Sequence, residues 1–495
     1  MRLSGNVWIT LINHAPADLI VHPVACLKGR WIHSDGRSRW VHRNPSDWDT
    51  VLGEVASASE QETCAAVVAA AEAQAVWREI PQPTRAEYLL SWERRLGEWA
   101  EPIALGVARE IGKPISEARA EVSRARETLR VTAQTHGIDR TERVSSKATV
   151  RQRPLGVVAA ITPWNNPVAI PIGKMAPALI YGNALVWKPA IQAPLSSRLL
   201  MQTLLASDIP PGLVNMLFGD AQTARALISH PGIAAVSLTG SNRTGRRTAA
   251  LCGKLLKPLQ AELGGNNAVI VMPDGESEMI ARELAESAFS FAGQRCTSNR
   301  RIIVIKDILP RFEAAMVAAI ESLVVGDPLL AETQVGPVIS RSKQRQIGRI
   351  VAKARSDGAE LLTGGRVPKA GRGGCWYQPT LFKTMTPDIK LVQEESFGPL
   401  AIIQPARDIE EAMDLCNGVP QGLMASLYSH DQAIIRRFLA NAQAGNIKLN
   451  LPTVGIELKA SFTGWKCSGL GPGEHGRSDR EFYSQSQALY GVHTD

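Results

Sequence analysis

Three side chains in separate parts of this chain are of types that could carry out catalytic chemistry. Cys296, within FAGQRCTSNR, has a thiol that could act as a nucleophile. Asn165, within ITPWNNP, has an amide that could donate to a developing oxyanion. Glu262, within LQAELGGNNAVIV, has a carboxylate that could act as a general base. Each also has a plain structural explanation, as a buried thiol, a turn asparagine or a solvated helix-end carboxylate, so none alone predicts catalysis.

A loop that contains two glycines is a candidate phosphate site. TGSNRTG, residues 239–245, follows a predicted strand and opens a predicted helix. Its glycines would let the backbone approach a phosphate, and the helix N-terminus would supply N–H groups and positive potential. The loop is not a Walker A motif, because Arg246 and Arg247 stand where lysine and serine or threonine are required. A simple strand-to-helix turn explains the loop about as well, so both interpretations stay open.

The order of apolar segments predicts the sheet that would position these residues. From about residue 155, short apolar runs alternate with helical segments, and the runs are LGVVAAI, NALVWKP, VNMLF and IAAVSLTG. This alternation predicts an α/β fold with a Rossmann-like, doubly wound parallel sheet. Ligands of such sheets bind at the carboxyl ends of the strands. The segments expected there are TPWNN, KPA, FGD and TGS.

The rest of the chain predicts helices, a second α/β domain and a small β arm. Residues 59–134 have helical periodicity, and Ser59 with Glu62 and Thr84 with Glu87 have capping-box spacing. A second alternation of strands and helices runs from about 268 to 450. TVRQRP and REFYSQSQALYGV are isolated strand-like pieces with no partner nearby in sequence. We expect them to pair across a subunit boundary.

Composition and charge exclude several classes of protein. The 495 residues are 44% hydrophobic and 21% charged, which is ordinary for a globular protein of two or three domains. The net charge of +8 comes from dispersed basic residues, which disfavours a nucleic-acid partner. No apolar run approaches the roughly 20 residues of a membrane span. The seven scattered cysteines contain no CxxC pair, which predicts neither disulfides nor a metal site and favours the cytoplasm.

Taken in order, the motifs resemble those of the aldehyde dehydrogenase superfamily, from about Trp31 to Tyr490. The segments that carry the resemblance are PWNNP, WKPA, TGS followed by Gly245, ELGG, GQRCT, EESFGP and NLPT. The resemblance implies a cofactor-binding domain of residues 1–134 and 155–262 and a catalytic domain of residues 263–465. Oligomerisation strands would occupy 135–154 and 478–495, in a homodimer or homotetramer.

The resemblance also implies a role for each of the three candidate catalytic residues. Cys296 would attack an aldehyde, Asn165 and the Cys296 backbone N–H would hold the oxyanion, and hydride transfer to a nicotinamide would leave a thioester. Glu262 would then activate water. A coenzyme-A-acylating enzyme is an alternative, although such members usually lack the base glutamate. A catalytically inactive ligand-binding relative is a second alternative.

Cofactor and substrate contacts follow from the same resemblance. The implied cofactor-binding residues are Ile161, Trp164, Lys188, Ile191, Gly240, Ser241, Gly245, Glu395 and Phe397. Lys188 would bond the adenosine ribose and Glu395 the nicotinamide ribose. Ile191 stands where NAD-preferring members often carry a glutamate that repels a 2′-phosphate, so the cofactor is expected to be NADP or NAD, with NADP favoured.

Departures from the family pattern concern the substrate. The implied substrate contacts are Asn166, Gly173, Arg295, Thr297 and Phe462, and Glu474 would lie near a proton route. Asn166 and Gly173 replace aromatic residues, which predicts a wider and more polar tunnel. The closest likeness is to α-ketoglutaric semialdehyde dehydrogenases, whose aldehyde ends in a carboxylate. Arg295 or Lys459 could hold such a group, although the substrate could instead carry an aromatic group.

Overall fold

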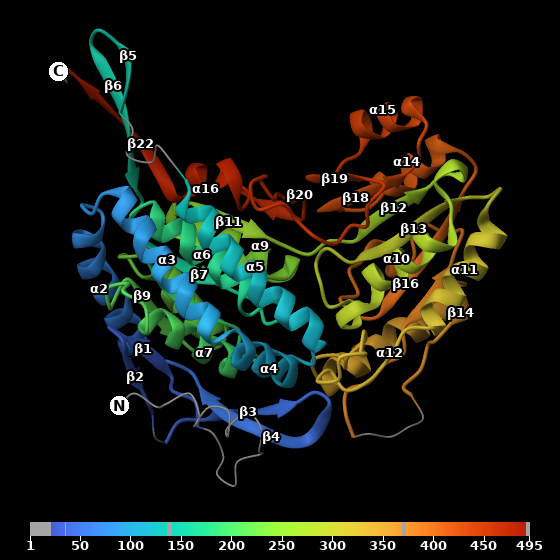
Figure 1. The fold of residues 1–495 in the computed structure, drawn as a ribbon, viewed down its shortest axis with the longest axis horizontal. Helices are drawn as coiled ribbons and strands as arrows, with labels where there is room; N and C mark the ends of the chain where they lie inside the picture. Colours follow the sequence, from blue (N-terminus) through green and yellow to red (C-terminus); the bar gives the residue numbers. More distant parts are fainter. Residues whose placement is uncertain (1–20, 35, 136–140, 369–372, 492–495) are drawn as a thin grey trace.

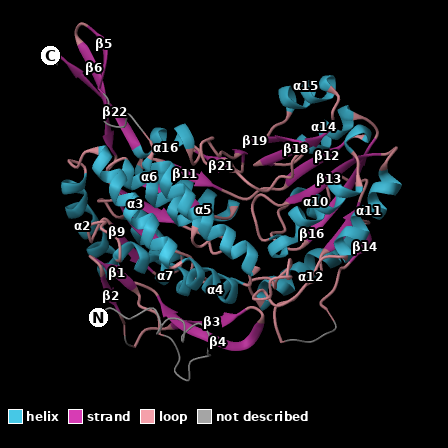
Figure 2. Ribbon diagram, in the orientation of Figure 1, coloured by secondary structure: helices cyan, strands magenta, loops and turns pink. Residues whose placement is uncertain are grey.

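The computed structural model describes residues 21–34, 36–135, 141–368 and 373–491. Two lobes lie side by side, each built on its own sheet, and a narrow β arm projects from the first lobe (Figures 1 and 2). The first lobe holds residues from the N-terminal half and the second holds residues from about 267 to 449. The predicted α/β fold class is confirmed.

The first lobe is built on an eight-stranded sheet with the order β2-β1-β9-β8-β7-β10-β11-β21. Its strands are β1 (Ala25–Leu27), β2 (Arg30–Ile32), β7 (Val157–Ile161), β8 (Ala184–Lys188), β9 (Val214–Leu217), β10 (Ala235–Thr239), β11 (Leu259–Glu262) and β21 (Gly469–Leu470). The five central strands, from β9 to β11, are parallel. These strands are apolar and almost fully buried because helices cover both faces, as the sequence predicts.

The strand order places a topological switch point between β7 and β10. From β7 the chain moves outward to β8 and then β9, and it returns to add β10 and β11 on the other side of β7. Connections that leave in opposite directions open a crevice at the carboxyl ends of the strands, where such sheets bind their ligands. Ile161, Lys188, Thr239 and Glu262 end β7, β8, β10 and β11 at this edge.

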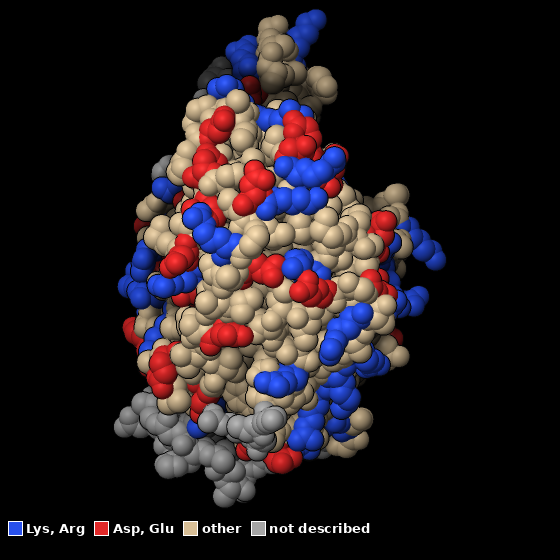
Figure 3. Space-filling model, turned by 90° about the vertical axis from the view of Figure 1, so that its right-hand side faces the viewer, with Lys and Arg blue, Asp and Glu red and all other residues tan. Residues whose placement is uncertain are grey.

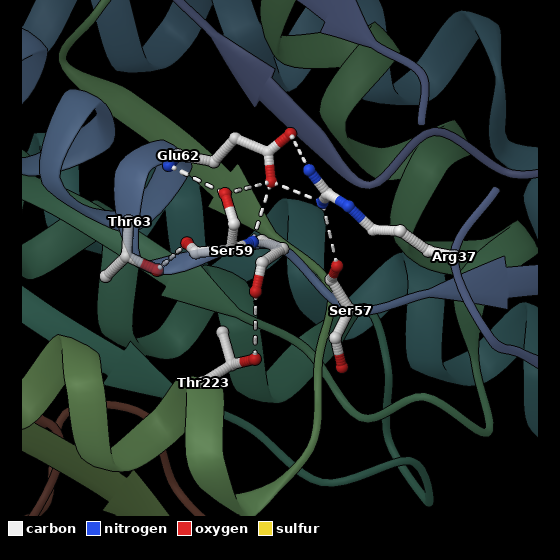
Figure 4. A network of polar contacts seen from close by, with 7 residues as sticks. Arg37, Ser57, Ser59, Glu62, Thr63 and Thr223 are labelled. Carbon is white, nitrogen blue, oxygen red and sulfur yellow. Dashed lines mark hydrogen bonds and ion pairs between the residues drawn. The ribbon is translucent and has the colours of Figure 1, made fainter. Parts of the chain in front are cut away.

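Eight helices of the described residues pack on this sheet. They are α2 (Glu60–Trp77), α3 (Gln82–Glu98), α4 (Ala100–Ile111), α5 (Ile115–Ala133), α6 (Ala169–Ile180), α7 (Pro194–Leu205), α8 (Ala221–Ser229) and α9 (Asn242–Leu255). At the start of α2 the predicted capping box is present, because the Glu62 N–H donates to Ser59 Oγ and the Ser59 N–H donates to the Glu62 carboxylate. Arg37 Nη1 binds the same carboxylate at 2.7 Å (Figure 4).

The second predicted capping box is wrong. Helix α3 begins at Gln82, two residues before Thr84, and Pro81 precedes it with no side-chain cap. Proline fits near a helix start because its missing N–H would be unpaired there anyway. Thr84 therefore lies inside the helix and is not at the N-cap position that a capping box requires.

The second lobe is a seven-stranded sheet with the order β14-β15-β16-β13-β12-β18-β19, parallel except at the β14 edge. Its strands are β12 (Asn267–Val271), β13 (Asn299–Ile305), β14 (Glu360–Thr363), β15 (Thr380–Lys383), β16 (Leu400–Ala406), β18 (Met424–Tyr428) and β19 (Asn446–Leu449). Its helices are α10 (Glu278–Phe289), α11 (Leu309–Glu321), α12 (Arg341–Ser356), α13 (Lys390–Gln393), α14 (Ile409–Asn417) and α15 (Gln432–Asn441), with short 3-10 helices η1 (Pro273–Gly275) and η2 (Ser290–Gly293). This is the expected second α/β unit.

The projecting arm pairs segments that are far apart in sequence. Strands β5 (Thr141–Ser145), β6 (Ala148–Pro154) and β22 (Ser484–Tyr490) form one sheet in the order β22-β6-β5. The two isolated strand-like pieces therefore pair with each other within one chain, and the expected pairing across a subunit boundary stays a prediction. Helix α16 (Gly476–Tyr483) precedes β22, so the strand begins at Ser484. Smaller hairpins join β3 (Arg39–Asn44) to β4 (Asp47–Ala56) and β17 (Gln421–Gly422) to β20 (Trp465–Lys466).

The composition predicts dispersed basic residues on the surface and no membrane span. On the face seen in Figure 3, lysine and arginine are interspersed with aspartate and glutamate. Among the described residues, no helix has both the length and the apolar composition needed to cross a membrane.

Candidate active site

A cavity of about 320 Å³ lies where the two lobes meet, and Cys296 and Glu262 both line it. The other lining residues include Asn166, Gly173, Arg295, Thr297, Phe462 and Glu474, so the structure gathers every predicted substrate contact and the predicted proton-route glutamate around one space. Helix α5, the start of α6 and residues 454–462 complete the wall. The sequence separation of these segments shows that only tertiary folding assembles this site.

Cys296 lies in a tight loop between η2 and β13. Gly293 enters this loop with φ +62°, and a Cβ there would come within 2.5 Å of the Gly398 carbonyl oxygen, so glycine is required. The Asn267 amide donates to the Cys296 carbonyl at 2.7 Å, which fixes the backbone. Burial, with added repulsion from Glu395 and Glu262, raises the pKa of the Cys296 thiol to about 12. The thiol is therefore protonated at neutral pH and needs a partner that takes its proton.

Glu262 is the candidate for the group that takes the Cys296 proton, because its carboxyl group lines the same cavity. It ends β11 and is buried, and its Oε2 atom has no hydrogen-bond partner among the described residues. Burial and the negative charge of Glu474 raise its pKa well above the ordinary value, against the opposing charge of Lys174. A carboxylate with a raised pKa is a stronger base. A buried polar atom without a partner that lines a cavity also suits an incoming water or substrate.

Asn165 follows β7 and lies beside the loop of Cys296. Its Nδ2 atom donates one hydrogen bond to the Gln294 carbonyl at 3.1 Å. An amide nitrogen carries two hydrogens, so the second remains for another acceptor. The structure therefore brings the Asn165 amide to Gln294, which lies two residues before Cys296 in the same loop. An oxyanion donor for Cys296 must lie near this loop.

Glu474 belongs to a buried ion pair that borders the cavity. It pairs with Lys174, which is fully buried on α6 and also donates to Ser237 Oγ at 2.9 Å. Thr239 Oγ1 donates to the Glu474 carboxylate at 3.3 Å. Burial raises the pKa of Glu474, but the charges of Lys174 and His475 and the hydrogen bonds from Lys174 and Thr239 together outweigh it and lower the pKa below the ordinary value. Glu474 is thus ionised beside a Glu262 that favours its neutral form.

The cations of the cavity wall are mostly matched by carboxylates. Arg295 is paired with Glu117, and Lys113 with Glu121. Asn166 accepts a hydrogen bond from Lys113 Nζ at 2.7 Å, so its amide is tied to this ion pair. The suggestion that Arg295 is free to hold a substrate carboxylate is therefore weakened, because Glu117 already neutralises it.

The space beside Gly173 is occupied by a neighbouring side chain. A Cβ at Gly173 would come within 3.3 Å of His475 Cε1, so the imidazole of His475 packs against this turn of α6. The wider tunnel at Gly173 stays a prediction, and the imidazole of His475 stands close to the position of the missing side chain. The accompanying prediction of a more polar wall agrees with the imidazole and with Asn166.

The predicted cofactor residues of the first lobe line up along the carboxyl edge of its sheet. Ile161 and Lys188 are direct neighbours across β7 and β8, and Leu238 is paired with Ile161 on its other side. Lys188 Nζ donates to the carbonyls of Pro189 and Gly219, and burial lowers its pKa to about 8. Ser241 caps α9 by accepting from the Thr244 N–H at 3.3 Å. This edge borders the switch point, as a dinucleotide site requires.

Close contacts between α9, the loop after β10 and the ELGG turn hold these loops together at the same edge of the sheet. A Cβ at Gly245 would come within 2.5 Å of the Leu263 side chain, so α9 can approach the ELGG turn only with glycine there. Gly240 donates its N–H to the Glu262 carbonyl at 3.0 Å, which links the two loops. Ile191 is half-buried against the core of this lobe.

The second lobe contributes Glu395 and Phe397 to the opposite side. The Gly265 N–H donates to Glu395 at 3.4 Å, and a Cβ at Gly264 would overlap the Glu395 carboxylate. Burial raises the pKa of Glu395 to about 7, opposed by Arg300. Phe397 packs edge-on against Trp164 with ring centroids 5.8 Å apart. The two lobes therefore meet at the end of β11 and at the loop after β7, where the predicted residues lie.

Some cavity residues were missed by the sequence analysis. Glu117, Glu121, Arg124 and Thr128 all line the cavity from α5, and His475 lines it from the loop before α16. The α5 residues recur every three or four positions, so they share one helix face. That polar stripe was the available signal. His475 offered none, because its position depends on the path of a loop.

A doubly wound sheet with a ligand crevice, joined to a second lobe that supplies a half-buried cysteine, defines an α/β fold with a candidate active site between its two lobes. Residues 31–489 match the aldehyde dehydrogenase family, and the chain belongs to that family. Its members are oxidoreductases that act on aldehydes, so the predicted resemblance and enzyme class are confirmed.

Individual relatives give the same result. The chain is 32% identical over 475 residues to the α-ketoglutaric semialdehyde dehydrogenase of Bacillus subtilis, covering 94% of this chain and 97% of the relative. It is 32% identical to the NADP(+) succinate-semialdehyde dehydrogenase of Escherichia coli, covering 90% and 93%. A mutant aldehyde dehydrogenase C of Pseudomonas syringae, solved with NAD⁺ and octanal, superposes with a TM-score of 0.91 at 30% identity, covering 97% and 100%.

Proposed function

We propose that this enzyme oxidises an aldehyde to its carboxylic acid by a covalent route through Cys296, with NAD or NADP as the hydride acceptor. The observation that supports this most directly is the shared cavity of Cys296 and Glu262 beside the switch point. A nucleophile, a base and a dinucleotide crevice in one place suit oxidation followed by hydrolysis.

The steps follow from the positions of the side chains. Glu262 in its carboxylate form takes the thiol proton, and the Cys296 sulfur bonds to the aldehyde carbon while the carbonyl oxygen takes the electron pair of the C=O bond. The second Asn165 amide hydrogen and the Cys296 N–H stabilise the oxyanion, and losing one such donor typically costs about 3 kcal/mol. A nicotinamide cofactor, when bound, would accept the hydride of the thiohemiacetal carbon and leave a thioester on Cys296. Once Glu262 has released the thiol proton to solvent, it removes a proton from water, the water oxygen bonds to the carbonyl carbon, and the carbon–sulfur bond breaks to leave the carboxylic acid and the Cys296 thiolate.

The residues at the crevice suit a dinucleotide. Lys188 stands at the end of β8 with only carbonyl partners for its ammonium group, so it could bond a ribose or a 2′-phosphate. Glu395 could hold the second ribose from the other lobe. Ile191 brings no negative charge to repel a 2′-phosphate. We therefore favour NADP over NAD as the preferred cofactor.

The cavity wall supports an aldehyde that also carries an anion. Arg124 lines the cavity from α5 and donates from Nη1 to the Ile456 carbonyl at 2.9 Å. No carboxylate among the described residues pairs with it, whereas Lys113, Lys174 and Arg295 each have one. A guanidinium that lines a cavity can bind a carboxylate through two parallel hydrogen bonds. We therefore assign the distal carboxylate of a semialdehyde acid to Arg124 in place of Arg295 or Lys459.

The oligomeric state of the enzyme and its cellular compartment are also proposals. In the arm, all of β5 and most of β22 are exposed, and β5 is an edge strand without a further partner among the described residues, which suits a homodimer or homotetramer. The seven cysteines are all free thiols, which suits the cytoplasm.

The experiment is a panel assay with purified protein. Straight-chain aldehydes and semialdehyde acids of matched length are each mixed with NAD⁺ or NADP⁺, with and without coenzyme A, and reduced cofactor is followed by absorbance. We expect reduction without coenzyme A. A strict requirement for coenzyme A would indicate the acylating alternative, and no reduction with any member would indicate a ligand-binding relative.

A further inference from the structure

His475 stands in a backbone conformation that almost only glycine adopts. Its φ is +65° and its ψ is 166°, and other residues pay about 1–3 kcal/mol to hold such a conformation. The surrounding structure fixes it there, because the His475 N–H donates to the Asp479 carboxylate at 2.9 Å and the imidazole packs on Gly173. Glycine would fit this position without strain. The strained backbone of His475 indicates that its imidazole has a functional role.

The imidazole lies in a wall between two cavities. The first is the cavity of Cys296 and Glu262, and the second is a larger hollow of about 890 Å³ bordered by α16, the end of α5 and β22. Thr128, Leu458 and His475 line both of them. Of these three residues, only His475 can take up and release a proton near neutral pH. Among the described residues, His475 is therefore the titratable residue that lines both the catalytic cavity and the second hollow.

The proposed reaction needs a proton outlet at this point. One turnover converts an aldehyde, water and oxidised cofactor into a carboxylate, reduced cofactor and two protons. During hydrolysis the acyl group fills the substrate cavity and the cofactor fills the crevice, so the two ligands obstruct the ordinary openings. A proton taken by Glu262 from the attacking water must leave before Glu262 can act again.

We propose that His475 carries this proton from the catalytic cavity to the second hollow. This inference rests on the proposed function. One ring nitrogen accepts a proton that Glu262 received from water, relayed through water within the cavity, and the other ring nitrogen releases a proton to solvent in the hollow. No bond other than N–H and O–H bonds forms or breaks, so the step is balanced and needs no further reactant.

The charged groups around the imidazole suit this task. Glu474 precedes it in the chain, Lys174 faces it from α6, Arg124 from α5, and Asp479 from α16. Burial, Lys174 and Arg124 lower the pKa of His475, whereas Glu474 raises it. The imidazole is therefore neutral at pH 7 and ready to accept a proton, and the adjacent Glu474 carboxylate stabilises the protonated form for long enough to pass it on.

The test uses His475→Gly, which relieves the backbone strain while it removes the imidazole. Stopped-flow absorbance follows hydride transfer, and a pH-indicator dye follows proton release in the same sample. We expect a normal first burst of reduced cofactor, followed by deacylation and proton release that are slowed by about tenfold or more. Added imidazole, which fits the vacated space, should restore the rate in proportion to its concentration. The melting temperature should not fall.

Two further variants separate the outcomes. His475→Asn keeps a polar side chain on the same strained backbone as the wild type but does not titrate, so it should be slow and should lose the pH dependence of deacylation. His430→Gln, at an exposed histidine of the second lobe, is the control and should match the wild type. Wild-type turnover, pH profile and proton release in His475→Gly would overturn the inference and leave the proposed function standing. A wild-type enzyme that reduces no cofactor would instead overturn the proposed function.

Discussion

The carboxyl group of Glu262 and the thiol of Cys296 line one cavity, although Glu262 ends a strand of the first sheet and Cys296 precedes a strand of the second. The negative charge of Glu262 contributes to the raised pKa of Cys296. Burial is the larger cause for both residues. Both pKa values are therefore raised, and Glu262 can take the thiol proton only in its carboxylate form.

Replacing Glu262 by glutamine should separate hydride transfer from hydrolysis. The amide keeps the size of the side chain but cannot accept the proton of water, so kcat should fall by about 10²–10⁴-fold. A first burst of up to one equivalent of reduced cofactor per active site should remain, followed by a stall. Cys296→Ala should show no burst at all. Steady turnover by Glu262→Gln at the wild-type rate would remove Glu262 from the mechanism.

The reactivity of Cys296 should rise steeply with pH in protein freed of nucleotide. The thiolate reacts with iodoacetamide, and a pKa of about 12 leaves the thiol protonated at neutral pH. The alkylation rate should therefore increase about tenfold per pH unit between pH 7 and 10. Mass spectrometry of the peptide that contains Cys296 measures this rate, and Cys296→Ser corrects for the other thiols. A plateau near pH 8 would contradict the raised pKa.

Introducing a glutamate at Ile191 should move the cofactor preference toward NAD. A carboxylate within several ångströms of a 2′-phosphate costs about 1–4 kcal/mol, so the ratio of the NADP to the NAD dissociation constant should rise about tenfold or more. Titration calorimetry with both nucleotides measures the ratio. Gln192→Glu adds the same charge at the exposed next residue and is the control. An unchanged ratio in Ile191→Glu would show that this position does not select the cofactor.

Removing the charge of Arg124 should affect anionic aldehydes alone. A charge-assisted hydrogen bond contributes about 1.5–3 kcal/mol, so Arg124→Met should raise KM for a semialdehyde acid by about 10–150-fold. The kcat/KM for a neutral aldehyde of the same length should stay the same or rise. Arg119→Met removes an exposed arginine from the same helix, where its surface pair with Glu101 contributes little. Equal losses on both substrates would argue against a carboxylate site.

Charges placed on the arm should weaken subunit association. Val144 on β5 and Tyr490 on β22 are 55% and 78% exposed, so their apolar surfaces are available to another copy. The double variant Val144→Glu with Tyr490→Glu should shift the mass found by light scattering toward the monomer. Leu256→Glu, at a 90% exposed position on the first lobe, should leave the mass unchanged. A wild-type protein that is already monomeric would refute the oligomer proposal.

The periodicity of the sequence was sufficient to predict most of the first sheet. Runs such as Val157–Ile161 and Ala184–Lys188 are apolar and β-branched because both faces of a parallel strand are buried. The short edge strands β1, β2 and β21 were not expected, because two or three residues carry no recognisable alternation. Pairing of β6 with β22 was also missed, since residues that are more than 300 positions apart give no local sign of contact.

The sequence by itself determined the residue types that can act, namely the thiol of Cys296, the amide of Asn165 and the carboxylate of Glu262, and their order along strands whose ends must lie at one edge. Only the tertiary structure decided how charge is distributed around them. It neutralised Arg295 with Glu117, left Arg124 facing the cavity and placed His475 in the wall between two spaces. The physical reason is that ion pairs and burial depend on distances across the fold, which a linear order of residues does not specify.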